Sequence, residues 1–191
     1  MLRKILFGLL LLSSSVVFAQ SETAIFAGGC FWCMQADFDK LTGVINTTVG
    51  YDGGQSQNPT YQLVESGTTH YVESVAVTFD PKIVSYQQVL DYYWHHIDPT
   101  VKDAQFCDVG SQYRTVIFYL NSTQQQQAQV SLDQIKKQFN TVYTEILPTT
   151  MFYPAEDYHQ KYYQKNPAHY EFYRFTCGRD ARVAEVWKGK L

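Results

Sequence analysis

The sequence predicts an α+β fold, in which a mixed sheet has helices packed on it. Three observations support this class. Short apolar, strand-like segments are interleaved with amphipathic helical segments, and hairpin-length turns join some of the strands. The 191 residues are enough for one domain with a substantial core. No repeat, long linker or change in composition divides residues 20–191, so we expect one domain there.

The first half of the chain is expected to form three strands and three helices. Residues 23–27 form an apolar strand that ends at two glycines. Apolar residues then recur at helical spacing, which predicts a helix over residues 30–41. The later elements are a strand over 44–51 with a turn at Asp52-Gly53-Gly54, a short helix after Asn58-Pro59, a strand over 70–79 and a helix from Ser85 to about His96.

The second half continues the alternation and then becomes harder to assign. A loop is predicted over 97–112, followed by a strand over 115–120, a helix over 122–139 and a strand over 143–147. From Pro148 onward we expect irregular structure with one short helix near 157–165.

The first 19 residues have the pattern of a secretory signal peptide. Arg3 and Lys4 precede an apolar run over residues 5–12, and Val17-Phe18-Ala19 resembles a cleavage site. No second apolar stretch has membrane length. We therefore expect the mature protein to be soluble and exported, most simply to a periplasm.

The charge of the chain argues against a nucleic-acid partner. It has 15 basic and 18 acidic residues, and removal of Arg3 and Lys4 leaves 13 against 18, a net charge of −5. No basic stripe interrupts this acidic balance. We expect neither nucleic acid nor, after signal removal, a membrane as a partner.

The most informative motif is Gly28-Gly29-Cys30-Phe31-Trp32-Cys33. It places Cys30 at a predicted helix N-terminus, where the helix dipole and unpaired N–H groups favour a thiolate. The paired glycines allow a sharp turn that leaves the sulfur accessible. The aromatic side chains of Phe31 and Trp32 suggest a small apolar pocket beside it. Taken alone, however, the cysteine pair also fits half of a structural disulfide set.

Glu73 is the predicted acid of this site. In the strand over 70–79, alternation places Glu73 on the same face as Val75, Val77 and Phe79. Desolvation on that face would raise the pKa of its carboxyl group. A carboxylic acid that is neutral at pH 7 can protonate a substrate oxygen. A Glu that reaches water or an ion pair is the simpler alternative.

The loop over residues 105–114 contains further candidates. Asp108 is suited to holding a catalytic loop, or to a plain turn. Tyr61 and Tyr113 are candidate hydroxyl donors, or packing residues. The adjacent His95 and His96 lie on different helix faces, and no metal-ligand spacing recurs, so no metal site is predicted.

Many motifs in one order resemble the A-type methionine sulfoxide reductases, the MsrA family. The resemblance covers nearly the whole mature chain. The chain departs from the commonest family pattern at Cys33, where glycine is usual. The matching stretches are Gly29-Cys30-Phe31-Trp32, Gly50-Tyr51 with Gly53-Gly54, Asn58-Pro59-Thr60-Tyr61, Ser66-Gly67 with Glu73, Asp98-Pro99, Asp108 with Gly110-Ser111-Gln112-Tyr113-Arg114, Thr144-Glu145-Ile146, residues 152–160 and Lys165-Asn166-Pro167.

The resemblance implies a two-layer α/β plait of the ferredoxin-like type and reduction of methionine-S-sulfoxide, free or in proteins. Cys30 would attack the sulfoxide sulfur and become a sulfenic acid, while Glu73 protonates the oxygen. Phe31 and Trp32 would hold the S-methyl group. Tyr61 and Tyr113 would hydrogen-bond the oxygen, and Asp108 would help to hold the site. No bound cofactor is implied.

The remaining cysteines would return the enzyme to its reduced state. Cys33 lies one helical turn after Cys30 and is expected to resolve the sulfenic acid as a disulfide, which an external thioredoxin-like dithiol would reopen. Cys177 is the other candidate resolver. In an oxidising compartment Cys107 and Cys177 tend to pair, either as a staple or as a relay.

Two other functions compete with this one. A periplasmic thiol–disulfide oxidoreductase of the thioredoxin type also begins a helix with two cysteines three residues apart, but it needs neither Glu73 nor the tyrosine-bearing loops. A disulfide-stapled binding module fits poorly with so large a core. Reduction of insulin disulfides against stereospecific consumption of a sulfoxide would separate the first two.

Overall fold

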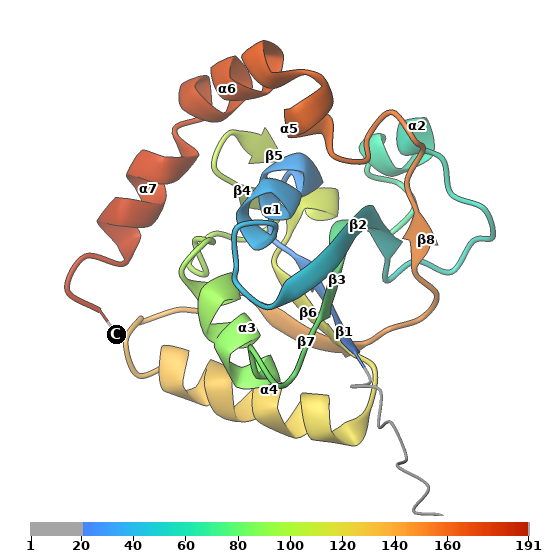
Figure 1. Cartoon of the computed structure of the whole chain (residues 1–191). Helices are drawn as coiled ribbons and strands as arrows, with labels where there is room; N and C mark the ends of the chain where they lie inside the picture. Colours follow the sequence, from blue (N-terminus) through green and yellow to red (C-terminus); the bar gives the residue numbers. More distant parts are fainter. Residues whose placement is uncertain (1–20, 191) are drawn as a thin grey trace, which may run out of the picture.

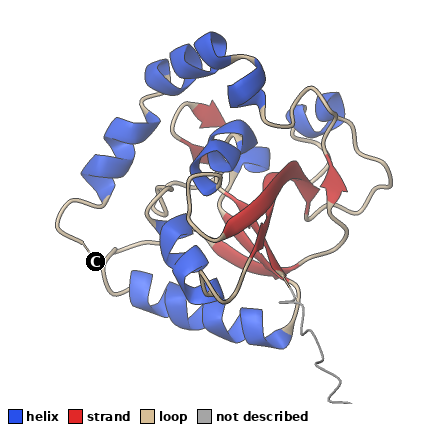
Figure 2. Ribbon diagram, viewed as in Figure 1, coloured by secondary structure: helices blue, strands red, loops and turns tan. Residues whose placement is uncertain are grey.

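The computed structural model describes residues 21–190, and the expected signal peptide over residues 1–19 lies outside them. The strands of the main sheet, red in Figure 2 and labelled in Figure 1, lie in the order β7-β6-β1-β3-β2-β8. Neighbouring strands are antiparallel except β6 and β7, so the sheet is mixed, as predicted. The strands are β1 (Glu22–Ala27), β2 (Val44–Asp52), β3 (Val72–Phe79), β6 (Val116–Tyr119), β7 (Glu145–Pro148) and β8 (Tyr153–Pro154).

Three helices cover one face of this sheet, which gives the predicted α+β layers. They are α1 (Phe31–Phe38), α3 (Tyr86–Trp94) and α4 (Ser122–Ile135). Their apolar stripes and the inward residues of β1, β3 and β6 form the main core. In β3 the alternation is confirmed, because Val75 and Val77 face the helices and Val72 lies in a separate cluster on the opposite face.

The predicted helices over 30–41 and 122–139 extend too far at their C-terminal ends. Leu41 and Phe139 follow α1 and α4 in turns, yet both pack against the main core. Because these two apolar residues fall at helical spacing, the sequence pattern predicted that each helix continued to them. The predicted loop over 97–112 contains a small hairpin of β4 (Ala104–Gln105) and β5 (Asp108–Val109).

The C-terminal segment contains the short helix predicted near 157–165, but the irregular structure predicted for the rest of it is wrong over residues 167–186. Three helices form in this segment: α5 (Tyr162–Lys165), α6 (Pro167–Thr176) and α7 (Arg179–Val186). Of the ten residues of α6, only Tyr170 is buried, so the helix lacks the apolar stripe that usually reveals one. Two local signals were present, namely Pro167 in the first turn and Gly178, which follows the helix with φ +69°.

The C-terminal helices form an arc outside α1 (Figure 1). Polar contacts fasten them there. Arg174 pairs with buried Asp37 of α1 at 2.9 Å, and buried Arg179 donates to the carbonyls of Gly28 and His96. The arc thereby brings α6 close to the N-terminus of α1. Within residues 21–190, no helix combines the length and apolar character needed to cross a membrane.

Candidate active site

Cys30 lies at the junction between β1 and α1. Gly29 turns the chain there with φ +81°, and a Cβ at this position would lie 2.6 Å from Cβ of Gln105. Only glycine fits such a turn without strain. Cys30 is the N-cap residue of α1, as predicted, and it is a free thiol with 6% of its surface exposed.

A small cavity of about 80 Å³ opens in front of Cys30. Seven of the residues predicted for the site line it together, although they come from β1–α1, α2, β3 and the hairpin region. Tyr173 of α6 is an additional lining residue. The cavity is lined by Cys30, Phe31, Trp32, Tyr61, Glu73, Asp108, Tyr113 and Tyr173.

Glu73 projects from β3 to the first turn of α1. Its Oε2 accepts a hydrogen bond from the backbone N–H of Phe31 at 2.9 Å, and the residue is buried. Burial raises the pKa of the Glu73 carboxyl to about 8, an effect that the Phe31 N–H opposes and nearby Asp108 reinforces. The carboxyl therefore holds its proton at neutral pH, as predicted.

The expectation that Cys30 forms a thiolate easily is not met by its surroundings. Burial raises the pKa of the Cys30 thiol well above its usual range, and the hydrogen-bonded sulfur of Cys33 and the carboxyls of Glu73 and Asp108 raise it further. Desolvation and like charges outweigh the advantage of a helix N-terminus. The resting form of Cys30 is thus a protonated thiol.

Cys33 lies behind Cys30 and does not line the cavity. It is a free, buried thiol that packs with Ala36 and Tyr170. The hydrogen bond from Cys30 and the positive charges of Arg179 and Arg174 lower the pKa of Cys33, and burial opposes them. Negative charge in the thiol pair is therefore favoured at Cys33.

Trp32 is held as a rigid wall of the cavity. Its ring stacks on Tyr162 with a centroid distance of 3.9 Å, and its Nε1 donates to Nδ1 of His159 at 3.0 Å. Burial lowers the pKa of His159 to about 4, so this imidazole is neutral and can accept the bond. Phe31 lies against the same imidazole at 5.0 Å. The two aromatics predicted to form a pocket share this support.

Tyr61 and Tyr113 come from two elements that are tied to each other. Tyr61 begins α2 (Tyr61–Glu65), and its backbone N–H donates to Glu156 at 2.9 Å. Tyr113 ends a 3₁₀ turn (Ser111–Tyr113), where Gln112 donates to the last α2 carbonyl, that of Glu65. Burial raises the pKa of both phenols, so both remain hydrogen-bond donors.

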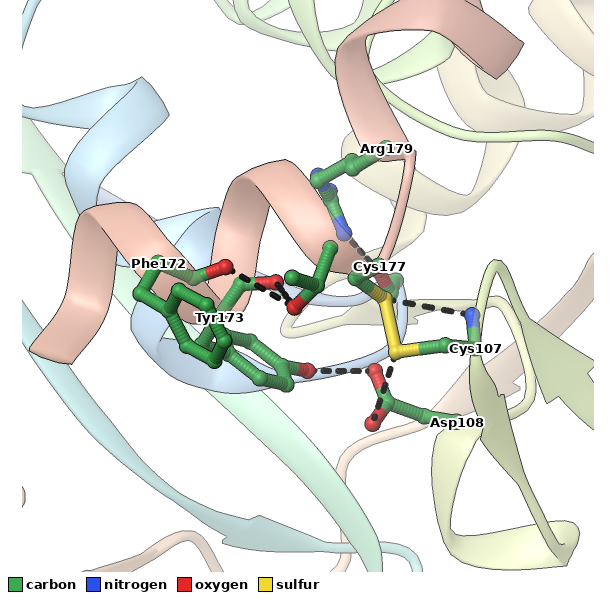
Figure 3. Close-up of a disulfide and its surroundings, with 8 residues drawn as sticks. Cys107, Asp108, Phe172, Tyr173, Cys177 and Arg179 are labelled. Carbon is green, nitrogen blue, oxygen red and sulfur yellow. Dashed lines mark hydrogen bonds between the residues drawn. A yellow bond between two sulfur atoms is a disulfide. The ribbon is translucent and has the colours of Figure 1, made fainter.

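Asp108, in the β4–β5 hairpin, also lines the cavity. Its Oδ2 accepts a hydrogen bond from Tyr173 at 2.6 Å. Burial raises the pKa of its carboxyl, an effect that Tyr173, Arg179 and the Cys30 N–H oppose. The preceding residue, Cys107, forms a disulfide with Cys177, so these two thiols do pair (Figure 3). Cys107, Asp108 and Cys177 also gather three potential metal-ligand atoms, but a disulfide offers no thiolate to an ion.

Two residues with clear roles in this geometry were missed by the sequence reasoning, Tyr173 and His159. Tyr173 lies in α6, a helix that was not predicted. His159 lies within residues 152–160, a stretch noted only as a family motif, and no local pattern links it to Trp32, 127 residues earlier.

The site combines a thiol, a neutral carboxylic acid and two phenols around a cavity of about 80 Å³. Such a site can attack an electrophilic sulfur while it protonates the leaving oxygen. The nearby second thiol can then condense with an oxidised sulfur. This chemistry fits reduction of a sulfoxide.

Comparisons with known proteins agree with the chemistry of the site. The family model described as "Peptide methionine sulfoxide reductase" matches residues 22–191. The chain is 47% identical to MsrA of Listeria innocua over 171 residues, which cover 88% of this chain and 97% of the relative. It is 46% identical to MsrA/MsrB of Vibrio cholerae, and there it spans only about half, 46%, of the relative's length.

A solved structure also resembles the fold. Methionine sulfoxide reductase A of Corynebacterium diphtheriae superposes with a TM-score of 0.75 at 33% sequence identity. The match covers 77% of this chain and 76% of that one.

Proposed function

Because the chain belongs to the peptide methionine sulfoxide reductase family and is an enzyme that reduces methionine sulfoxide, we propose that Cys30 is its nucleophile and Glu73 its acid. The thioredoxin-type alternative is thereby set aside. The sulfur of Cys30 bonds to the sulfoxide sulfur while Glu73 gives its proton to the oxygen. The oxygen then passes to Cys30, which becomes a sulfenic acid, and methionine leaves.

The protonated state of Cys30 gives Glu73 a second task. As the thiol attacks, its proton must leave, and the Glu73 carboxylate formed by protonating the oxygen is a base in the same cavity. One carboxyl thus acts first as acid and then as base, and the reaction releases no net charge into the buried site.

We assign substrate selection to the aromatic walls. Phe31 and Trp32 hold the methyl group, and the hydroxyls of Tyr61 and Tyr113 donate to the oxygen, so only one placement of methyl and oxygen fits the attack by Cys30. The selected epimer is the S form. The cavity of about 80 Å³ accepts the sulfoxide head group that free and protein-bound residues share.

Recycling is assigned to Cys33. Its lowered pKa favours a thiolate, which attacks the Cys30 sulfenic acid and forms a Cys30–Cys33 disulfide, while the hydroxyl group takes up a proton and leaves as water. A dithiol reductant of the thioredoxin type then supplies two electrons and two protons. We also retain export as a proposal, on the grounds of Arg3, Lys4 and the apolar run that follows, and N-terminal sequencing of the purified protein would test it.

The observation that carries this proposal is the single cavity in which a free thiol, a protonated carboxyl and two phenols meet. Cys30→Ser should abolish reduction of the S epimer while circular dichroism shows a folded protein, and the R epimer serves as the substrate control. In Cys33→Ser, one turnover without reductant should leave Cys30 as a sulfenic acid that dimedone labels. Residual turnover in Cys30→Ser would move the chemistry to another residue.

A further inference from the structure

Two residues that line the cavity are carried by the two segments that the disulfide joins. Cys107 lies in the β4–β5 hairpin, directly before Asp108. Cys177 follows α6, four residues and about one helical turn after Tyr173. A single covalent bond therefore connects both segments, which are 70 residues apart in sequence at this point (Figure 3).

Hydrogen bonds continue this connection towards the nucleophile. The Cys107 N–H donates to Sγ of Cys177 at 3.2 Å, and the Tyr173 hydroxyl donates to Asp108 at 2.6 Å. Asp108 and Tyr173 line the same cavity as Cys30, close enough that the Cys30 N–H lowers the pKa of the Asp108 carboxyl and the Cys30 sulfur raises that of the Tyr173 phenol. The disulfide lies one residue from Asp108 along the chain and about one helical turn from Tyr173.

Little buried apolar surface holds either segment, so apart from the disulfide they depend on polar contacts such as the pair of Arg174 with Asp37. The hairpin pairs only two residues on each side, and Val109 is 79% exposed. The α6 helix buries only Tyr170, while Phe172 and Phe175 are 69% and 84% exposed. Elements with so little buried apolar surface open at low free-energy cost. The disulfide limits such opening, because it joins the two segments covalently.

We propose that the Cys107–Cys177 disulfide is a positioning clamp, which holds Asp108 and Tyr173 against Cys30 during the attack on the sulfoxide. Neither cysteine lines the cavity, so the pair acts through these two residues and takes no part in the attack step. The inference rests on the proposed function, because it takes Cys30 as the nucleophile. It differs from a relay, in which the pair would accept oxidation from Cys30 after methionine has left.

A first-turnover assay separates a clamp from a relay. The wild-type protein, prepared with two free thiols, and the Cys107→Ser/Cys177→Ser variant are mixed with the S epimer without reductant, and methionine formation is timed over a range of substrate concentrations. A clamp requires the maximal first-turnover rate constant to fall by about tenfold or more, the scale of one lost transition-state hydrogen bond. An unchanged first turnover with slowed multiple turnover would establish a relay and overturn the clamp.

A double-mutant cycle tests whether the disulfide acts through Tyr173. In the wild type, Tyr173→Phe should slow the first turnover by about tenfold, and in the variant without the disulfide by less than about twofold. Tyr61→Phe is the matched control, because Glu156 rather than the disulfide holds that tyrosine; its effect should be equal in both backgrounds. Equal effects of Tyr173→Phe in both backgrounds would refute the clamp.

The wild type itself provides a second measurement if the double variant does not fold. The protein with all four thiols reduced should show the same slow first turnover, and reoxidation to two thiols should restore the fast one. Identical rates in both forms would refute the clamp. Failure of the proposed function looks different, because Cys30→Ser would then form methionine whatever the state of Cys107 and Cys177.

Discussion

Replacement of Glu73 by Gln tests the chemistry of the site most directly. The carboxyl of Glu73 accepts a hydrogen bond from Phe31 N–H at 2.9 Å, and the carbonyl oxygen of a glutamine can accept the same bond. The side chains are nearly equal in size, so the buried site keeps its packing. The variant loses the transferable proton.

The pKa of about 8 sets the expected pH dependence. About 90% of the Glu73 carboxyl is protonated at pH 7. Because the protonated form is the active one, kcat/KM for the S epimer should persist below pH 8 and fall about tenfold per pH unit above it. Glu73→Gln should lose about 10²–10⁴-fold in rate and lose this alkaline limb.

The same pKa predicts an effect on stability in the opposite direction. Below the unfolded pKa of 4.5 the Glu73 carboxyl is protonated in both states and does not change the free energy of unfolding. Between pH 4.5 and 8 the group ionises only in the unfolded protein, so unfolding becomes increasingly favourable as the pH rises. At 1.36 kcal/mol per pH unit, this cost reaches about 3 kcal/mol at pH 7. Glu73→Gln should therefore raise the free energy of unfolding by up to about 3 kcal/mol at pH 7 and by little at pH 4.5.

The assay pairs initial rates for the S epimer between pH 6 and 9.5 with urea unfolding at pH 4.5 and 7 for both proteins. A rate loss of less than about threefold would mean that a tyrosine or water supplies the proton. An equal stability difference at the two pH values would mean that Glu73 is ionised in the folded protein.

Two further predictions concern the neighbours of the thiols. Trp32→Ala removes the ring that lines the cavity and stacks on Tyr162, so kcat/KM for the S epimer should fall by about tenfold or more. The rate at which iodoacetamide alkylates Cys30 should stay within a few-fold. A large change in that rate would show that the ring controls the reactivity of the thiol instead. Arg174→Gln removes one of the positive charges that lower the pKa of Cys33, so the thiolate absorbance near 240 nm should appear at higher pH. Lys40→Gln removes an exposed charge and serves as the control. If the titration of the Arg174→Gln variant does not move, this electrostatic role of Arg174 is contradicted.

The sequence by itself determined what depends on local backbone geometry. Two glycines before an apolar helical pattern placed Cys30 at a helix start, and the period of two along β3 placed Glu73 on the buried face with a raised pKa. These inferences held because turn conformation and strand alternation are set by neighbouring residues. The layered α+β arrangement followed from the same patterns.

The tertiary structure decided what depends on burial and on contacts between distant segments. It showed that Cys30 is a protonated thiol, since desolvation and the carboxyls of Glu73 and Asp108 act on it only after folding. It also added Tyr173, because α6 is stabilised by ion pairs and a disulfide to segments far away in sequence rather than by an apolar stripe of its own. No local pattern encodes such contacts, because their free energy exists only once the partners have been brought together.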